Sequence, residues 1–199
     1  MSGTDVVIVD SGGANLASLT FALERLGARS RVSSDARTIS SAARVMLPGV
    51  GAAGEAMARL QDLNLVDCLR SLQQPLLGIC LGMQLLFTES AEGNTACLGI
   101  IAGSVQRLSG GPARPVPHMG WNCCRQLAAD PLLMNLSERD YFYFVHGYAA
   151  AASAATTAVT DYGVPFSAVV SHENFHGVQF HPERSSSAGA RVLANFLAL

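Results

Sequence analysis

The sequence predicts an α/β protein in which a mostly parallel central sheet is flanked by helices, with added antiparallel strands in the second half. In the first half, short apolar runs of strand length alternate with segments of helical periodicity, which is typical of a parallel sheet covered on both faces. The second half is richer in apolar, β-branched and aromatic runs of strand length. No linker or internal repeat divides the 199 residues. We therefore expect a single domain over residues 1–199.

The elements of the first half follow from apolar runs and their punctuation. A β-branched strand over 5–10 precedes a helix that begins at Asn15 and is stopped by Gly27. A second strand, over 44–47, is ended by Pro48 and Gly49. The remaining elements expected here are a helical region over about 53–72, a buried strand over 75–79 and a helix over 81–87.

The second half contains five further predicted strands and a final helix. Val192, Leu193, Phe196 and Leu197 give the chain a C-terminal helix. The alanine run over 149–155 is short and reads as an exposed turn region. The five strands are expected over 100–105, 141–145, 158–160, 167–170 and 177–180.

Composition excludes several classes of function. A net charge of −2 with 14% charged residues gives neither a basic stripe for nucleic acid nor an acidic tail. The longest apolar runs are too short to span a membrane, and the first residues lack the features of a signal peptide, so we expect a cytoplasmic protein. The five cysteines are odd in number and form no CxxC pair, which argues against a disulfide framework or a metal site. No phosphate-binding motif is present, and no cofactor is expected.

The stretch "GICLG", residues 78–82, places Cys80 between two glycines at the end of a buried strand. This is the form of a nucleophile elbow, in which glycines let backbones approach around a strained turn. Ligands bind at the carboxyl ends of strands in open α/β sheets. The N-terminus of the following helix favours a thiolate, and its N–H groups can hold an oxyanion. Alone, the motif also fits a cysteine in a tight strand–helix turn.

A nucleophilic cysteine needs a base and a group that orients the base. Of the five histidines, His181 is the best candidate because it follows a buried run and precedes Pro182 and Glu183. Pro182 biases His181 towards extended backbone, and on an extended chain His181 and Glu183 point to the same side. Alone, this pattern also fits a strand-terminal histidine beside a solvated glutamate.

Taken together, "GICLGMQLLF" and "GVQFHPE" resemble the class I glutamine amidotransferases, which carry a Cys-His-Glu triad. Within that class, "LPGVG", "VPHMGWN" and "YFYFVHGY" are similar to the glutaminase subunits of imidazole glycerol phosphate synthase, an enzyme of histidine biosynthesis. The resemblance covers nearly the whole chain and implies a class I glutamine amidotransferase-like, flavodoxin-like fold.

The resemblance also implies roles for individual residues. Cys80, His181 and Glu183 would hydrolyse the side-chain amide of glutamine to give glutamate and ammonia. Gln84 follows Cys80 by one helical turn, hence on the same face. The oxyanion would be held by the N–H of Leu81 and by one from the turn over 48–51, assigned to Gly51, and the remaining glutamine-binding residues would be Gln84, Glu92, Gly147 and Tyr148.

A partner is implied as well. Ammonia released into water at neutral pH becomes mostly ammonium, a poor nucleophile, so the partner should cover the site. The family's partner is a cyclase with a β/α barrel, which forms a heterodimer with the glutaminase. It makes imidazole glycerol phosphate and aminoimidazole carboxamide ribonucleotide. Glycines on both sides of Val50 would let a peptide there reorient when the partner binds.

The chain departs from the family pattern at several positions, and other functions stay open. The usual DYGxGN turn has Ser11 in place of tyrosine and Ala14 before Asn15; HSY has Gly147, and HPEKS has Arg184. One alternative is a glutaminase that serves another synthase, such as that for pyridoxal phosphate or anthranilate. A non-catalytic regulatory module and a γ-glutamyl peptidase are the others.

Overall fold

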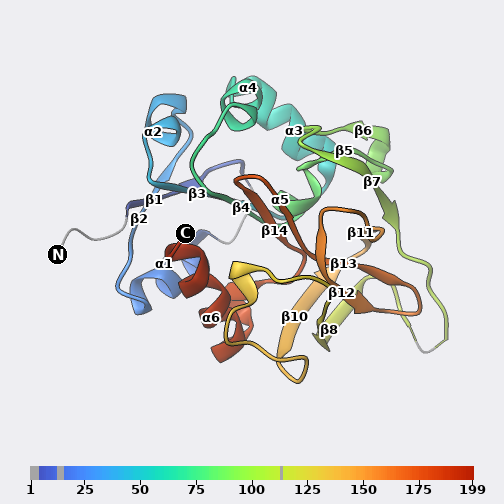
Figure 1. Ribbon diagram of the computed structural model, residues 1–199. Helices are drawn as coiled ribbons and strands as arrows, with labels where there is room; N and C mark the ends of the chain where they lie inside the picture. The colour runs from blue at the N-terminus through green and yellow to red at the C-terminus, as the bar shows by residue number, and fades with distance from the viewer. Residues whose placement is uncertain (1–4, 13–15, 113) are drawn as a thin grey trace.

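The computed structural model describes residues 5–12, 16–112 and 114–199. Figure 1 shows a central sheet with helices on both of its faces. Asn15, where the first helix is expected to begin, lies outside the described residues, as does Ala14. The central-sheet strands are β1 (Asp5–Val9), β2 (Arg29–Ser33), β3 (Arg44–Gly49), β4 (Leu76–Cys80), β9 (Arg125–Gln126), β12 (Thr156–Asp161), β13 (Pro165–His172) and β14 (Phe175–Val178).

Helices and two smaller sheets complete the described chain. The α-helices are α1 (Leu16–Arg25), α2 (Ala36–Ser40), α3 (Ala53–Asp62), α4 (Val66–Arg70), α5 (Leu81–Gln84) and α6 (Ser186–Leu197), and the 3₁₀ turns are η1 (Glu92–Asn94), η2 (Pro131–Leu133) and η3 (Pro182–Arg184). One small sheet contains β5 (Phe87–Ser90), β6 (Thr95–Ala96), β7 (Ile101–Arg107) and β11 (Tyr148–Ala150), and the other contains β8 (His118–Cys123) and β10 (Tyr141–His146).

The central sheet runs in the order β2-β1-β3-β4-β14-β13-β12-β9. Neighbouring strands from β2 to β14 are parallel, and β13, β12 and β9 add an antiparallel edge. This confirms the predicted fold class. Strand β4, which ends at Cys80, lies between β3 and β14, so residues just beyond these three parallel strands meet at one end of the sheet.

Each face of the sheet buries its own set of helices. Leu19 and Leu23 of α1 join Val192 and Phe196 of α6 in one hydrophobic cluster, and helices α2, α3 and α4 contribute to a separate cluster on the other face. Gly27 ends α1 at a φ of +76°, as predicted. Because both faces are covered, the central strands contain few polar residues, which is why the sequence shows continuous apolar runs there.

Several predicted element boundaries differ from the structure, and three of the differences have a physical reason. The helical region over 53–72 is divided into α3 and α4 by Asn64, which has a φ of +55°; asparagine tolerates this left-handed conformation better than most residues. The helix over 81–87 is a single turn that stops at Gln84, and Phe87 already begins β5. Strand β3 continues through Pro48, because its pairing with β1 ends at Met46 and the proline therefore interrupts no ladder on that side.

Sequence patterns missed several short strands. Strand β2 has mostly exposed residues and lies at the sheet edge, so it lacks the apolar run of a buried strand. Strand β8 contains most of the "VPHMGWN" segment, and β5, β6 and β9 are four residues long or shorter. The alanine run is not wholly an exposed turn, since Ala149 and Ala150 are buried in β11.

Candidate active site

Cys80 ends β4 in a conformation that few non-glycine residues adopt, with φ of +53° and ψ of −111°. Tight packing holds this turn. A Cβ added to Gly78 would lie 2.7 Å from the carbonyl oxygen of Gly82, and a Cβ on Gly82 would collide with the carbonyl of Leu47 in β3. Backbone strain of this kind persists only where the surroundings enforce it. The glycines of "GICLG" are therefore required by close backbone contacts, as the elbow motif predicts.

His181 and Glu183 form a buried pair beside this elbow. His181 has extended backbone (φ −97°, ψ 97°), as expected before proline. Nδ1 of His181 lies 2.8 Å from Oε1 of Glu183. The predicted contact is present, but the route to it is different: Glu183 lies in the 3₁₀ turn η3 rather than on extended chain. The turn reverses the backbone so that the carboxylate faces the imidazole.

The protonation of His181 depends on its two neighbours. Burial alone would lower its pKa, but interactions with Cys80 and Glu183 outweigh this and raise the pKa to about 10. The contribution of Glu183 is supported by the 2.8 Å hydrogen bond. Nε2 is buried and makes no hydrogen bond in this conformation. A raised pKa favours the charged imidazole, so Nε2 is suited to take and hold the proton of the neighbouring thiol.

The nine residues predicted from the sequence all line one cleft of about 310 Å³. The cleft therefore contains a thiol, an imidazole–carboxylate pair and polar groups from four separate parts of the chain. Its lining includes Cys80, His181, Glu183, Gly51, Leu81, Gln84, Glu92, Gly147 and Tyr148.

The expected oxyanion donors lie on two sides of the thiol. Leu81 is the first residue of α5, so its N–H has no acceptor within the helix. Gly51 has a φ of +90° and an open environment, with only Oε2 of Glu55 within 4.0 Å of an added Cβ. Gly49 differs from Gly51: an added Cβ would lie 2.8 Å from the amide nitrogen of Gly82. Gly49 is thus needed for packing against the elbow, and Gly51 is the glycine with conformational freedom.

Two of the expected glutamine-binding side chains already make contacts within the protein. Gln84 is buried, and its Nε2 donates to the carbonyl of Tyr148 at 2.8 Å and to Oε1 of Gln179 at 3.0 Å. Both hydrogens of that amide are therefore used. Oε2 of Glu92 accepts from the N–H of Ala53 at 2.8 Å and caps α3. A ligand in the cleft would meet the remaining oxygen of each side chain.

Two buried residues near the cleft were not predicted. His146 ends β10 and lines the cleft, where its Nε2 lies 3.1 Å from Nδ1 of His118. Gln179 is fully buried, and its Nε2 lies 3.6 Å from Sγ of Cys80. The signal for Gln179 was a polar residue inside the apolar run "GVQF", because a buried amide needs a specific partner.

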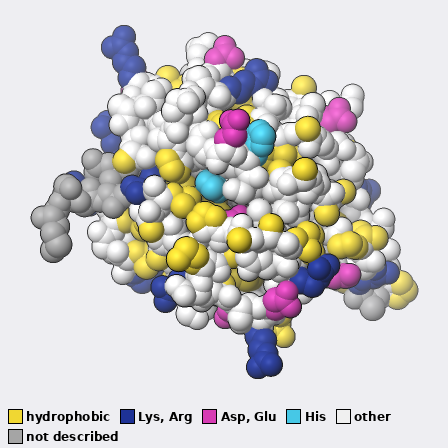
Figure 2. Space-filling view, in the orientation of Figure 1, with side chains coloured by type: hydrophobic (Ala, Val, Ile, Leu, Met, Phe, Trp, Pro, Cys, Tyr) yellow, Lys and Arg dark blue, Asp and Glu magenta, His cyan; other side chains and the backbone are white. Residues whose placement is uncertain are grey.

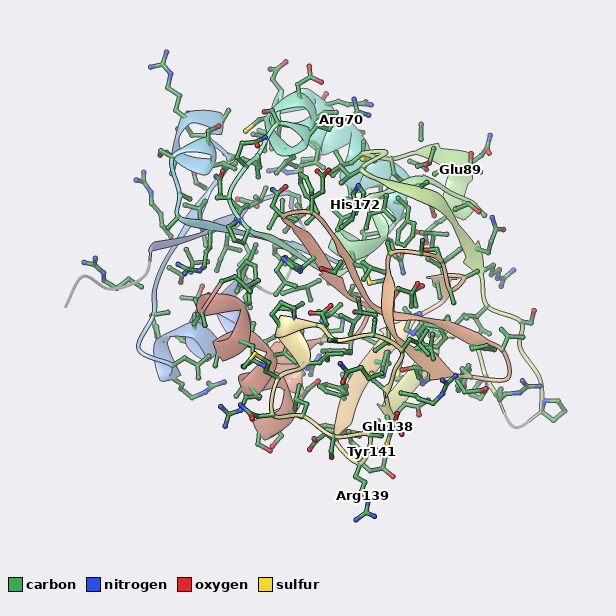
Figure 3. The ribbon with its side chains drawn as sticks, viewed as in Figure 1. Arg70, Glu89, Glu138, Arg139, Tyr141 and His172 are labelled. Carbon is green, nitrogen blue, oxygen red and sulfur yellow. The ribbon has the colours of Figure 1, made fainter. Side chains whose placement is uncertain are left out.

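The other histidines lie away from the thiol. His176 contacts Oγ of Ser171 through Nδ1 at 2.9 Å. Figure 3 shows His172 near Arg70, at the end of the sheet where β14 begins, whereas His181 follows the other end of that strand. Of these three, only His181 is placed to exchange a proton with Cys80.

The described residues form neither a membrane-crossing helix nor a cluster of metal ligands, and the visible face carries charges of both signs. Figure 2 shows acidic and basic side chains interspersed on the visible face. No helix among the described residues is long and apolar enough to cross a membrane. Within the same residues, no group of three or more His, Cys, Asp or Glu side chains is arranged to hold a metal ion.

Comparisons with known proteins identify close relatives over nearly the full length. A protein from Xylella fastidiosa (strain Temecula1) named "Imidazole glycerol phosphate synthase subunit HisH" is 52% identical over 196 residues, with 98% of each chain covered. A protein of the same name from Xanthomonas euvesicatoria pv. vesicatoria is 54% identical over the same length and coverage.

Solved structures with low sequence identity share the fold. The crystal structure of a glutamine amidotransferase superimposes with a TM-score of 0.75 at 17% identity, covering 97% of each chain. The structure of PurLQS from Thermotoga maritima gives 0.72 at 19% identity, with 98% of each covered. The model of the family "Glutamine amidotransferase class-I" matches residues 7–199. The chain is therefore a member of the class I glutamine amidotransferase family, whose enzymes act through a nucleophilic cysteine.

Proposed function

We propose that this chain is the glutaminase subunit of imidazole glycerol phosphate synthase, and that Cys80, His181 and Glu183 are its catalytic triad. The observation that carries the proposal is the meeting, in one cleft, of a strained Cys80 with the buried His181–Glu183 pair. The names of relatives that match 98% of the chain support the choice of synthase. They favour it over a glutaminase for pyridoxal phosphate or anthranilate synthesis.

The chemistry assigns one task to each residue. Sγ of Cys80 attacks the side-chain carboxamide carbon of glutamine, and its proton passes to Nε2 of His181. His181 then protonates the departing nitrogen, which leaves as ammonia. The N–H groups of Leu81 and Gly51 hold the oxyanion. Water attacks the resulting thioester while His181 accepts a proton from it, the bond between carbon and Sγ breaks, and glutamate is released. His181 then returns the proton to the thiolate of Cys80. Glu183 orients the imidazole and stabilises its charged form.

Ammonia would pass to a cyclase partner with a β/α barrel, bound in a heterodimer. An apolar surface beside the cleft supports such a partner. Met119 and Trp121 of β8 are 64% and 53% exposed, and the ring of Trp121 meets Tyr143 edge-on at 5.9 Å. The guanidinium of Arg184, which lines the cleft, lies 5.4 Å from the centre of the Tyr143 ring. Exposed aromatic residues of this kind are enriched where proteins associate.

The partner would use the ammonia to make imidazole glycerol phosphate and aminoimidazole carboxamide ribonucleotide in histidine biosynthesis. The chain would serve as one glutaminase domain over residues 1–199, without a cofactor. Its five cysteines are all free, which suits the reducing environment of the cytoplasm.

The test is to purify the chain with its natural cyclase and compare glutamine-dependent with ammonia-dependent synthesis. Cys80→Ala should abolish the glutamine-dependent reaction and leave the ammonia-dependent reaction largely intact. Cys97→Ala removes another buried thiol and serves as the matched control, which should keep both activities. Glutamine turnover by Cys80→Ala would overturn the assignment. Glutamine turnover with no coupling to the cyclase would overturn the choice of partner.

A further inference from the structure

A chain of buried polar side chains runs from β8 to the thiol of Cys80. Nδ1 of His118 contacts Nε2 of His146 at 3.1 Å, and Nδ1 of His146 contacts the carbonyl of Tyr148 at 2.8 Å. The same carbonyl accepts from Nε2 of Gln84, which also donates to Oε1 of Gln179. Gln179 then reaches Sγ of Cys80. The four histidine and glutamine side chains of this network are all buried.

The chemistry of the groups fixes the direction of each hydrogen bond. A carbonyl oxygen only accepts, so Nδ1 of His146 carries the hydrogen, and its Nε2 accepts from His118. Burial lowers the pKa of both rings to about 4, in keeping with these neutral forms. Gln84 donates one hydrogen to Tyr148 and one to Gln179. The oxygen of Gln179 must therefore face Gln84, and its NH₂ group must face the sulfur of Cys80.

The two hydrogen bonds at Sγ have opposite effects on the ionised thiol. The thiol donates to the carbonyl of Val145 at 3.8 Å, and that contact is lost when the proton leaves. Gln179 donates to sulfur at 3.6 Å, and a hydrogen bond from an N–H group strengthens when the acceptor becomes charged. Helix α5 is a single turn of four residues, so its dipole gives the thiolate little support.

We propose that Gln179 is a positioning residue for the reaction, which stabilises the thiolate of Cys80 through a donated hydrogen bond and is held in this orientation by Gln84. As a neutral amide, Gln179 favours the anion without competing with His181 for the proton. Its full burial means that it does not contact a ligand in the cleft. The ionisable or charged groups that line the cleft with Cys80 are His181, Glu183 and Arg184 beyond β14, His146 and Tyr148 around the end of β10, and Glu92.

This inference rests on the proposed nucleophilic role of Cys80, but thiol reactivity can be measured without turnover. The full-length chain would be alkylated with iodoacetamide across a pH series, and modification of the peptide that contains Cys80 would be followed by mass spectrometry. Gln179→Leu removes the donor at similar volume. Gln179→Glu keeps the shape and the oxygen that faces Gln84 but places a negative charge near sulfur. Gln74→Leu is the control, because it removes amide hydrogen bonds at the opposite end of β4.

We expect Gln179→Leu to move the midpoint of the alkylation profile upward by about one pH unit, which is about tenfold slower modification below the midpoint. Gln179→Glu should move it further, because like charge opposes ionisation. In glutamine hydrolysis with the partner, Gln179→Leu should lower kcat and leave KM nearly unchanged. Gln74→Leu should have the alkylation midpoint, kcat and KM of the native chain.

An unchanged midpoint in a folded Gln179→Leu chain would overturn the inference. If that variant does not fold, Gln179→Glu decides, and a midpoint equal to the native value has the same meaning. The two proposals remain distinguishable. Full glutaminase activity in Cys80→Ala would overturn the proposed function, while the alkylation profile of Gln179→Leu would still report on Gln179. If Cys80→Ala is inactive but Gln179→Leu shows no shift of the alkylation midpoint, only the role of Gln179 is overturned.

Discussion

Nδ1 of His181 lies 2.8 Å from Oε1 of Glu183, and each of the two side chains is more than nine-tenths buried. Water therefore cannot replace either partner easily. The carboxylate holds the imidazole in one orientation and raises its pKa together with Cys80. An imidazolium formed during turnover would have its positive charge balanced at once, without a rearrangement of solvent.

The first prediction concerns this pair. Glu183→Gln should lower kcat for glutamine by at least tenfold, but by less than His181→Ala, because general-base catalysis contributes about 10²- to 10⁴-fold and only its orienting group is removed. Steady-state kinetics of the complex with its partner measure both effects. Because triad members act as a unit, the double variant should lose far less than the product of the two single losses. Multiplicative losses would contradict a shared hydrogen-bonded unit.

A second prediction concerns acid stability. His118 and His146 have pKa values lowered to about 4 by burial, whereas unfolded histidine titrates near 6.5. Between these values the unfolded chain binds protons that the folded chain does not, so the free energy of unfolding should fall as pH drops from about 6.5 to 4. His118→Phe keeps a ring between Phe144 and Tyr162 and removes one titrating group.

Urea unfolding at several pH values measures this slope. The slope for His118→Phe should be shallower by up to about 1.4 kcal/mol per pH unit, the value for one proton. His176, whose pKa is also lowered by burial, contributes with the same sign in both chains and cancels in the comparison. Identical slopes would mean that the pKa of His118 is the same in the folded and unfolded chain, which would contradict the lowering by burial.

A third prediction concerns the elbow. An added Cβ at Gly82 would collide with the backbone carbonyl of Leu47, which no side-chain rotation can relieve. Gly82→Ala should therefore destabilise the fold by about 3 kcal/mol or more. Gly99→Ala is the control: Gly99 has a φ of +66° and open space around it, so it should cost only about 1 kcal/mol. Denaturant midpoints of the two variants decide, and equal losses would contradict the close contact.

A fourth prediction concerns activation by the partner. Replacing Gly49 with a β-branched residue would disturb the elbow directly, so Gly51 is the cleaner probe. Gly51→Val should weaken the rise in glutamine turnover on adding cyclase and its nucleotide by tenfold or more, because a β-branched residue restricts the backbone rotation that glycine allows at this position. Val50→Ala is the neighbouring control. In the native protein, the rate of glutamine hydrolysis should differ between the chain alone, the chain with its partner, and the complex with nucleotide. Three equal rates would contradict activation by the partner.

A fifth prediction concerns the missing serine hydroxyl. A Cβ on Gly147 would lie 3.7 Å from Cγ1 of Val116, an ordinary contact. Gly147→Ser should thus change the free energy of unfolding by less than about 0.5 kcal/mol. If a hydroxyl there reaches glutamine, KM should fall about fivefold, as one hydrogen bond of about 1 kcal/mol implies. An unchanged KM would mean that only the backbone at this position contacts the substrate.

How far the sequence predicts the fold depends on burial. Strand β4 and the run around Val178 are buried on both faces, and their continuous runs of apolar residues are easy to recognise in the sequence. Strand β2 lies at the edge with mostly exposed residues, so hydrophobic pattern carries little information there. The helix predicted over 81–87 is longer than α5 because Leu85 and Leu86 are also buried. A short run of apolar residues looks the same in a helix as in a strand.

The site was predictable where local motifs determine it. The elbow around Cys80 and the step from His181 to Glu183 are each set by neighbouring residues, so a short motif contains the geometry. Gln179 contacts Gln84 and Cys80, which precede it by 95 and 99 residues along the chain. No local spacing reports such a contact. The sequence shows only that a glutamine stands within an apolar strand, and the fold is needed to identify its partners.

The position of β4 between β3 and β14 has a consequence for the protein while it is being made. The turn with Gly51 follows β3, and His181 follows β14, late in the chain. A ribosome therefore makes the elbow of Cys80 well before it makes His181. In the proposed mechanism, a nascent chain that stops before β14 has no base for its thiol, so we expect it not to hydrolyse glutamine.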